Sequence, residues 1–231
     1  MTINLTVEQL AEKIDHTLLK ADAQEVGFEK LCQEAREYGF KMVAINPSPV
    51  TLCKRLLKDS SVHVGAAIGF PLGQTTIKTK TFETKEAIEN GADEIDYVIN
   101  ISKLKDGNTD YIKEEMQAIV DICKKNDVLS KVILETCYLE DEEKKQVCKI
   151  AKKVQPDFVK TSTGFGAAGA TTADVRLMKE EVVGEKIKVK AAGGIRDLNT
   201  VKAMIEAGAD RLGMSASVRV IEEYKAEKKL S

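Results

Sequence analysis

Short apolar and β-branched runs alternate along the chain with longer segments whose apolar positions repeat at helical spacing. Eight such runs occur, and about 20 to 40 residues separate each run from the next. Strands separated by helical patterns are typical of parallel β-α-β units, and eight of them predict a closed (β/α)₈ TIM barrel rather than an open sheet. The first run is the weakest of the eight. The predicted strands lie near Ile14 and at residues 42–45, 62–68, 94–99, 131–135, 157–161, 187–191 and 211–213.

Capping residues mark where several helices begin. Thr6 and Gln9 have the spacing of a capping box, which predicts an extra N-terminal helix before the first strand. Ser48 followed by Pro49 is typical of an N-cap with proline at the first helical position. Asp197 can cap a helix over residues 198–207.

Two near-repeats, ENGAD at residues 89–93 and EAGAD at residues 206–210, each lead into a predicted strand. Glycine readily adopts the left-handed backbone conformation that ends a helix. We therefore interpret both segments as helix-to-strand turns at the end of the barrel away from the chemistry, where they contribute to stability.

Length and composition favour one folded domain over residues 1–231. The chain has 43% hydrophobic residues, enough for a sizeable core and too many for a disordered protein. No apolar run approaches the roughly 18 residues that a membrane span needs. Residues 1–9 lack the basic and apolar pattern of a secretory signal, so we expect a cytoplasmic protein.

Charge and metal-ligand content exclude further classes. The net charge is −2 and basic residues are interleaved with acidic ones, so nothing indicates nucleic-acid binding. The five cysteines include no Cys-x-x-Cys pair, which fits reduced thiols without an assigned role. His16 and His63 are the only histidines, which argues against a catalytic metal site, and His63 fits a buried core position.

Two lysines stand inside apolar strand runs, Lys160 and Lys190. Each can point outward and extend its stem beside a helix. Alternatively, both can lean into the same barrel mouth, because they lie 30 residues apart, about one β-α unit. Burial and a neighbouring ammonium group both disfavour the charged form of a lysine. A lysine with a pKa near neutrality is a nucleophile that forms a Schiff base with a carbonyl, and the residues alone do not choose between the two.

Three further charged residues stand near these lysines in the predicted barrel. Asp96 alternates with Glu94, so both carboxylates share one strand face. Asp96 can pair with a lysine, move protons beside an imine, or do both. Asp15 is either a similar carboxylate or a local turn partner, and Lys131 is either an ion-pair partner of Asp96 or Asp15 or a catalytic group.

Glycines and a serine after the last strands predict a phosphate site. Loops after strands seven and eight of TIM barrels often bind phosphate through backbone N–H groups and a helix N-terminus. No nucleotide-binding loop follows any strand, so no nucleotide cofactor is indicated. The candidate phosphate-binding residues are Gly164, Gly193, Gly194, Gly213 and Ser215.

Five segments, in the same order along the chain, resemble the deoxyribose-phosphate aldolase family. They are IDHTLL at 14–19, DEID at 93–96, KVILET at 131–136, FVKTSTGF at 158–165 and VKAAGGIR at 189–196. The segments that contain Lys160 and Lys190 are the specific ones, and the resemblance runs from about Ile14 to Ser215.

The resemblance implies a class I aldolase, a lyase that needs no metal or other cofactor. Lys160 would form the Schiff base, with Asp96 and Lys190 as proton donors or acceptors. The reaction would be reversible cleavage of 2-deoxy-D-ribose 5-phosphate to acetaldehyde and D-glyceraldehyde 3-phosphate, in cytoplasmic deoxyribonucleoside catabolism. The partners would be this sugar phosphate and aldehydes. Apart from the resemblance, we expect a homodimer, because dimers are the commonest oligomers of soluble enzymes.

Two positions depart from the family pattern. Some members have cysteine where this chain has Ala44, and some have a second serine where it has Ala216. The alternatives to an aldolase are a phosphosugar isomerase or epimerase that forms no imine, a barrel that binds without turnover, and a metal-dependent aldolase.

Overall fold

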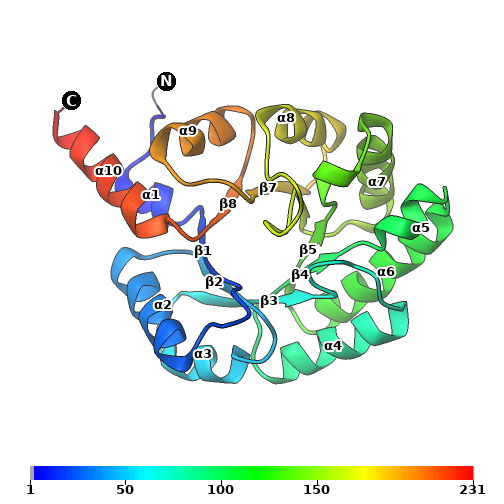
Figure 1. Ribbon diagram of the computed structural model, residues 1–231, viewed down its shortest axis with the longest axis horizontal. Helices are drawn as coiled ribbons and strands as arrows, with labels where there is room; N and C mark the ends of the chain where they lie inside the picture. Colours follow the sequence, from blue (N-terminus) through cyan, green and yellow to red (C-terminus); the bar gives the residue numbers. More distant parts are fainter. Residues whose placement is uncertain (1–2, 231) are drawn as a thin grey trace.

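The computed structural model describes residues 3–230, which form a closed barrel of eight parallel strands in chain order (Figure 1). The predicted TIM barrel is therefore confirmed, including the weakly marked first strand. The observed limits differ from the predicted ones by one or two residues at several ends, and the fifth strand begins and ends two residues early. The strands are β1 (Ile14–Leu18), β2 (Met42–Ile45), β3 (His63–Ile68), β4 (Glu94–Val98), β5 (Leu129–Ile133), β6 (Phe158–Lys160), β7 (Lys188–Ala192) and β8 (Arg211–Met214).

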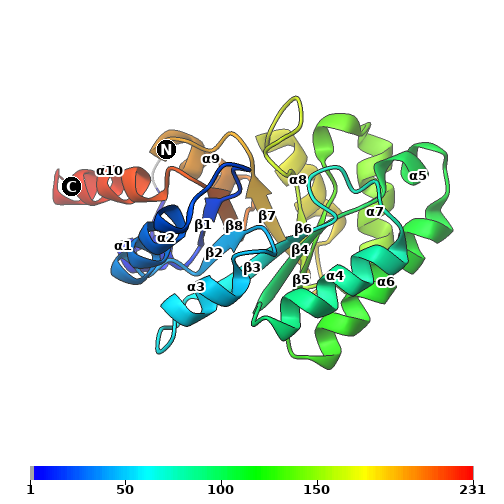
Figure 2. The ribbon, with the colours of Figure 1, turned by 60° about the horizontal axis from the view of Figure 1, so that its bottom comes forward.

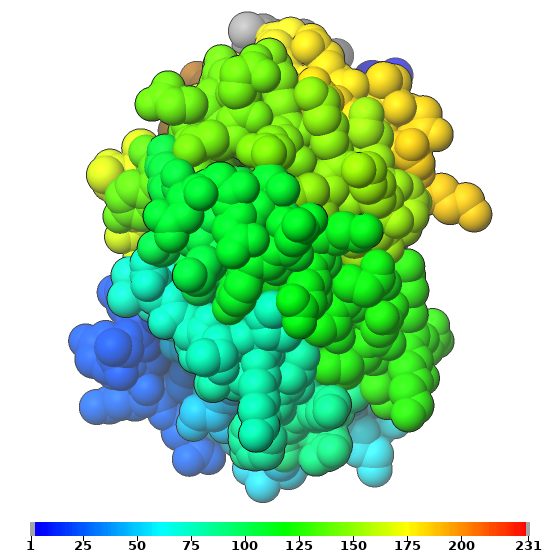
Figure 3. Space-filling view, turned by 90° about the vertical axis from the view of Figure 1, so that its right-hand side faces the viewer, coloured from blue at the N-terminus to red at the C-terminus, as the bar shows by residue number. Residues whose placement is uncertain are grey.

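Helices surround the barrel on its outside, as two views of the ribbon show (Figures 1 and 2). On the side that carries α4 to α7, their side chains form a continuous outer wall (Figure 3). None of the described helices is long and apolar enough to cross a membrane. The helices are α1 (Val7–Ala11), α2 (Glu25–Tyr38), α3 (Val50–Leu56), α4 (Ile77–Glu89), α5 (Ile101–Lys105), α6 (Thr109–Lys125), the 3₁₀ helix η1 (Thr136–Tyr138), α7 (Asp141–Val154), α8 (Thr172–Glu181), α9 (Leu198–Glu206) and α10 (Ser217–Leu230).

The alternation of side chains along each strand separates an apolar layer from a charged one. In β4, Ile95 and Tyr97 belong to the hydrophobic core shared with the helices. Glu94 and Asp96 point the other way, into the barrel, where they reach Lys131 on the next strand. The expectation that both carboxylates share a face is confirmed.

The two near-repeats are the predicted turns between helix and strand. Gly91 and Gly208 both have positive φ, at 107° and 108°. The aspartate two residues after each glycine accepts a hydrogen bond from a backbone N–H of the neighbouring strand and one from a helical lysine. These donors are Val64 and Lys54 for Asp93, and Val189 and Lys179 for Asp210.

The helix starts agree with the sequence in two cases and differ in one. Thr6 forms the predicted capping box with Gln9, and Asp197 caps α9. The predicted start at Ser48–Pro49 is wrong, because Pro49 is itself the N-cap residue and Val50 is the first helical residue. The Pro47 carbonyl accepts from the Val50 N–H at 3.1 Å, a turn that delays the helix.

Candidate active site

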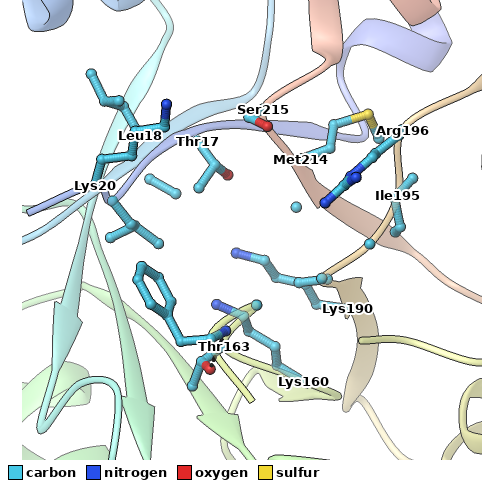
Figure 4. Close-up of a pocket in the computed structure, with 18 residues that line it drawn as sticks. Thr17, Leu18, Lys20, Lys160, Thr163, Lys190, Ile195, Arg196, Met214 and Ser215 are labelled. Carbon is cyan, nitrogen blue, oxygen red and sulfur yellow. Dashed lines mark hydrogen bonds between the residues drawn. The ribbon is translucent and has the colours of Figure 1, made fainter. Parts of the chain in front are cut away.

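A pocket opens where the carboxyl ends of the strands meet, as expected for this barrel type. Residues from the ends of β1, β2, β6, β7 and β8 line it. Figure 4 shows the amino groups of Lys160 and Lys190 side by side, both directed toward the cavity. The prediction that the two lysines share one barrel mouth is therefore confirmed, and the outward-pointing alternative is wrong. Their Cα atoms are register partners on β6 and β7.

Asp96 stands at the centre of the charged groups below this pocket. Its Oδ2 accepts from Lys160 Nζ at 2.7 Å and from Lys190 Nζ at 2.6 Å, while its Oδ1 accepts from Lys131 Nζ at 2.6 Å. Burial alone would raise the pKa of Asp96, but the three ammonium groups hold it well below its usual value. Asp96 therefore stays ionised, and its Oδ2 joins the amino groups of Lys160 and Lys190 through two hydrogen bonds.

Lys160 is buried, with 4% of its surface exposed, and that little exposure faces the pocket. Burial, and then the neighbouring ammonium group of Lys190, lower its pKa to about 8 against the opposing effect of Asp96. An amine with this pKa is partly uncharged near neutral pH, as a nucleophile requires.

Lys190 contacts two carboxylates, where Lys160 contacts only one. Its Nζ lies 2.6 Å from Asp15 Oδ2 and 2.6 Å from Asp96 Oδ2. Asp15 is completely buried in the barrel. The reading of Asp15 as a local turn partner is wrong, because its contacts are made by residues of β7 and β8.

Lys131 lies deeper than the other two lysines and does not line the pocket. Its Nζ lies 2.5 Å from Glu94 Oε2 and 2.6 Å from Asp96 Oδ1. These two carboxylates keep the pKa of Lys131 raised although burial opposes this. The ion-pair interpretation of Lys131 with Asp96 is confirmed, and Asp15 is not its direct partner.

The predicted phosphate residues gather on the other wall of the pocket. Gly164, Gly193 and Gly194 have φ of 88°, 87° and 77°, and all three line the cavity together with Gly213 and Ser215. The loops after β6 and β7 touch here, because the Ala170 N–H donates to the Gly193 carbonyl at 3.1 Å. Arg196 adds a cationic side chain to the same wall (Figure 4).

Comparisons with known proteins agree with this geometry. Residues 10–220 match the family described as DeoC/LacD family aldolase. The chain belongs to the DeoC/LacD aldolase family. Deoxyribose-phosphate aldolases from Bacteroides thetaiotaomicron and Lactobacillus acidophilus are 59% and 54% identical to it, over 98% and 97% of this chain and 94% of each relative. The family resemblance inferred from the five segments is thus confirmed, as is the assignment to the lyases.

Solved structures show the same family likeness. The chain matches the deoxyribose phosphate aldolase of Aeropyrum pernix, described as having a unique tetrameric structure, with a TM-score of 0.90 and 32% identity, over 96% of this chain and 93% of the other. A structure named QR15, an aldolase, matches with a TM-score of 0.89 and 39% identity, over 96% and 98%. Membership of this aldolase family removes the grounds for an isomerase or a barrel without turnover.

One of the two departures from the family pattern lies in the aldolase pocket. Ala44 lines the pocket, so β2 presents a methyl group there. Ala216 follows the lining residue Ser215 but does not itself line the cavity, and its carbonyl accepts from the Val220 N–H.

Two groups of the aldolase barrel were given no role from the sequence. Arg211 is buried at the start of β8 and binds Asp15. The same signal that marked Lys160, a charge within a buried run, was available for it. Glu135 follows β5 in the left-handed conformation and accepts hydrogen bonds from Thr163, which fixes the loop after Lys160. That pairing joins residues 28 positions apart, so no local pattern indicates it.

The two histidines occupy different environments in this aldolase. The prediction of a buried core position is wrong for His63, whose side chain is 32% exposed at the start of β3. The side chain is partly exposed because β3 begins at the lower rim of the barrel. Its Nδ1 lies 2.7 Å from Glu94 Oε1. His16 lies outside the pocket, between Ser217 and Glu34.

Proposed function

We propose that this aldolase cleaves 2-deoxy-D-ribose 5-phosphate reversibly to acetaldehyde and D-glyceraldehyde 3-phosphate through an imine on Lys160. The named activity of relatives 54–59% identical over nearly the whole chain supports the substrate. The observation that carries the mechanism is one carboxylate, Asp96, shared by three lysines, of which Lys160 reaches the pocket with a lowered pKa.

The first step is attack by the uncharged Lys160 amine on the C1 aldehyde of the open-chain sugar. The resulting carbinolamine loses water after its hydroxyl is protonated, and Asp96 and Lys190 lie within hydrogen-bond reach to move that proton. The iminium ion formed is the electron sink for the next step.

Removal of the proton from the C3 hydroxyl group then breaks the C2–C3 bond. The electron pair of that bond moves into the iminium, which gives an enamine on Lys160 and releases glyceraldehyde 3-phosphate. Protonation of the enamine at C2 regenerates the iminium, and water hydrolyses it to acetaldehyde and free Lys160. In this scheme Asp96 and Lys190, which lie beside Lys160, are the protein groups that accept the proton from the C3 hydroxyl, directly or through water, and return one to C2.

The glycine-rich wall would bind the phosphate at the far end of the substrate. Gly164, Gly193 and Gly194 have no side chain to block close approach, and Ser215 and Arg196 add a hydroxyl group and a positive charge. An anchored phosphate holds C1 over Lys160, which converts a bimolecular attack into an intramolecular one.

Of the two pocket lysines, Lys160 is the better nucleophile on the geometry. Lys190 touches Asp15 and Asp96 and so has two carboxylates to balance its charge, whereas Lys160 touches only Asp96. Lys190 then supplies the neighbouring positive charge that disfavours the charged form of Lys160, and it is the proton donor of the proposed reaction.

Borohydride trapping tests the imine. The protein is incubated with 2-deoxyribose 5-phosphate and borohydride, and the modified peptide is mapped by mass spectrometry. We expect an adduct on Lys160 and none in Lys160→Arg. An adduct on Lys190 would exchange the roles of the two lysines, and substrate binding without any adduct would contradict the imine mechanism.

We also propose that the protein works in the cytoplasm as a homodimer. The charge balance and the absence of a membrane-spanning helix among residues 3–230 fit the first part. Cyclic dimers are the commonest oligomers of soluble proteins. Light scattering on the purified protein tests the second part, and a monomer or tetramer mass would contradict it.

A further inference from the structure

Below the pocket, the barrel interior holds a second layer of charge that the proposed reaction does not use. Glu94 is completely buried and Arg211 is 6% exposed, and neither lines the substrate pocket. Arg211 instead borders a cavity at the opposite end of the barrel, together with Lys41 and Lys188. These two residues therefore cannot touch the reacting atoms.

Arg211 joins the two carboxylates that hold Lys190 and Lys131. Its Nε donates to Asp15 Oδ1 at 2.9 Å, and its Nη2 contacts Asp15 as well and lies 3.3 Å from Glu94 Oε2. Asp15 in turn contacts Lys190, and Glu94 contacts Lys131. Each of these lysines donates to Asp96. The second layer therefore reaches Asp96 by two separate paths.

The charges inside the barrel do not balance when every group is ionised. Three carboxylates, Asp15, Glu94 and Asp96, face four cations, Lys131, Lys160, Lys190 and Arg211. The interior is neutral only when one cation loses its proton. Arginine is always protonated in proteins, and Lys131 and Lys190 each contact two carboxylates. Lys160, with one carboxylate, is the cation whose loss of a proton costs least.

We propose that Arg211 and Glu94 are positioning residues that set the charge balance around Lys160 and, through Asp15 and Lys131, hold Lys190 and Asp96 in place. Arg211 supplies the surplus positive charge that favours the uncharged amine of Lys160. Glu94 limits that surplus. This inference rests on the proposed imine at Lys160 and deepens it.

Other charged groups lie at the two rims of the barrel. The lower rim carries His63 on β3 and Lys41, whose Nζ lies 3.3 Å from His63 Nε2. The upper rim carries Glu135, a buried carboxylate whose pKa is raised by burial. Among residues 3–230, the charged and titratable groups of the barrel interior and its two rims are Asp15, Lys41, His63, Glu94, Asp96, Lys131, Glu135, Lys160, Lys190 and Arg211.

The test is the pH dependence of kcat/KM for deoxyribose phosphate cleavage, which rises as Lys160 loses its proton. A unit charge within about 10 Å, acting through an effective dielectric of about 20, changes a pKa by about one unit. We expect Arg211→Gln to move the rising limb up by about one pH unit, which lowers kcat/KM about tenfold at pH 7. Glu94→Gln should move the limb down by a similar amount.

Two further variants separate charge from shape. Arg211→Lys keeps the charge and should leave the limb within a few tenths of a unit of the wild-type position. The double variant Arg211→Gln/Glu94→Gln removes one charge of each sign and should restore the wild-type limb. Lys144→Gln is the matched control, because it removes a lysine with two carboxylate partners on the outer helices.

Opposite shifts in the two single variants, with return in the double variant, support the proposal. An unmoved limb in Arg211→Gln or Glu94→Gln would overturn it, as would equal shifts in Arg211→Gln and Arg211→Lys. If Arg211→Gln does not fold, Glu94→Gln still decides, because a limb that moves to lower pH cannot come from a general loss of activity. If Glu94→Gln does not fold, the comparison of Arg211→Gln with Arg211→Lys decides. Trapping on Lys160 is measured in parallel, so that a failed imine is distinguished from a failed charge balance.

Discussion

Two buried lysines of this protein differ in their surroundings, and the proposed function gives only one of them a part in the reaction. Lys80 on α4 is completely buried between the barrel and the outer helices, and Lys160 is 4% exposed at the barrel mouth. Burial lowers the pKa of both side chains. Lys80 donates to the Val98 carbonyl at 2.6 Å and to Glu115 at 2.5 Å.

Lys80 and Lys160 differ in how many lysines share their carboxylate partner and in whether the amino group reaches a cavity. Glu115 has one lysine partner and also accepts from the Asn100 N–H, so the pair is complete. Asp96 is shared by three lysines, and Lys160 opens onto the pocket. Burial alone therefore does not make a nucleophile. In the proposed reaction, competition for one carboxylate and access to the cavity distinguish Lys160 from Lys80.

The largest effect is expected at Lys160. Replacing it with methionine, Lys160→Met, removes the nucleophile and should lower kcat by about 10⁴-fold or more. Steady-state cleavage of deoxyribose phosphate measures this, with borohydride trapping alongside. Near-normal turnover by the folded variant would contradict the distinction between the two lysines.

Lys80→Met is the reverse experiment and should affect stability rather than chemistry. Removing one partner of a buried ion pair leaves an uncompensated charge, here Glu115, at a cost of about 3–5 kcal/mol of unfolding free energy. Denaturant unfolding measures the loss. Trapping on Lys160 at a temperature where the variant is folded should be unchanged, and loss of the adduct in folded protein would show that Lys80 serves the reaction.

Burial of Lys160 could be predicted from the sequence, and burial of Lys80 could not, for a physical reason. A lysine within a short apolar strand stands out, because every neighbour is buried. Lys80 lies in an amphipathic segment of α4 among other lysines and threonines, where a charged residue is expected on the solvent face. Its partner Glu115 is 35 residues away on α6, so only the packing of two helices shows that both are buried.

The same limit applied to the candidate site. The strand order and the barrel mouth followed from the spacing of apolar runs, and this placed Lys160, Lys190 and Asp96 correctly. The partners of Asp15 were not predictable, because Lys190 and Arg211 approach it only when β8 closes against β1. The closed barrel was predicted, but which side chains meet across its interior depends on the strand register and on side-chain reach, and the spacing of apolar runs gives neither.

The pH dependence sharpens the comparison further. Since burial and Lys190 lower the pKa of Lys160 to about 8, the reactive uncharged amine is the minor form below that pH. We expect kcat/KM to rise about tenfold per pH unit below about pH 8 and to level off above it. Lys80→Met should give the same profile, because Lys80 faces Glu115 rather than the pocket. If the rising limb moved in Lys80→Met, the charge of Lys80 would influence the pKa of Lys160, which contradicts this expectation.

The smallest effect is expected for Gly169→Ala, which tests phosphate binding separately from the reactivity of Lys160. A Cβ atom at Gly169 would stand 2.2 Å from the Gly193 carbonyl oxygen, so Gly169→Ala must push the loops after β6 and β7 apart. Overpacking of this kind costs about 1–3 kcal/mol, and we expect KM for deoxyribose phosphate to rise about tenfold. Borohydride trapping with acetaldehyde, which carries no phosphate, should be unchanged.

Ala168→Ser is the control on the same loop, because Ala168 is exposed. Equal loss of trapping with both aldehydes would place the defect at Lys160 itself, whereas loss confined to the phosphorylated sugar would show that the glycine wall acts through the phosphate.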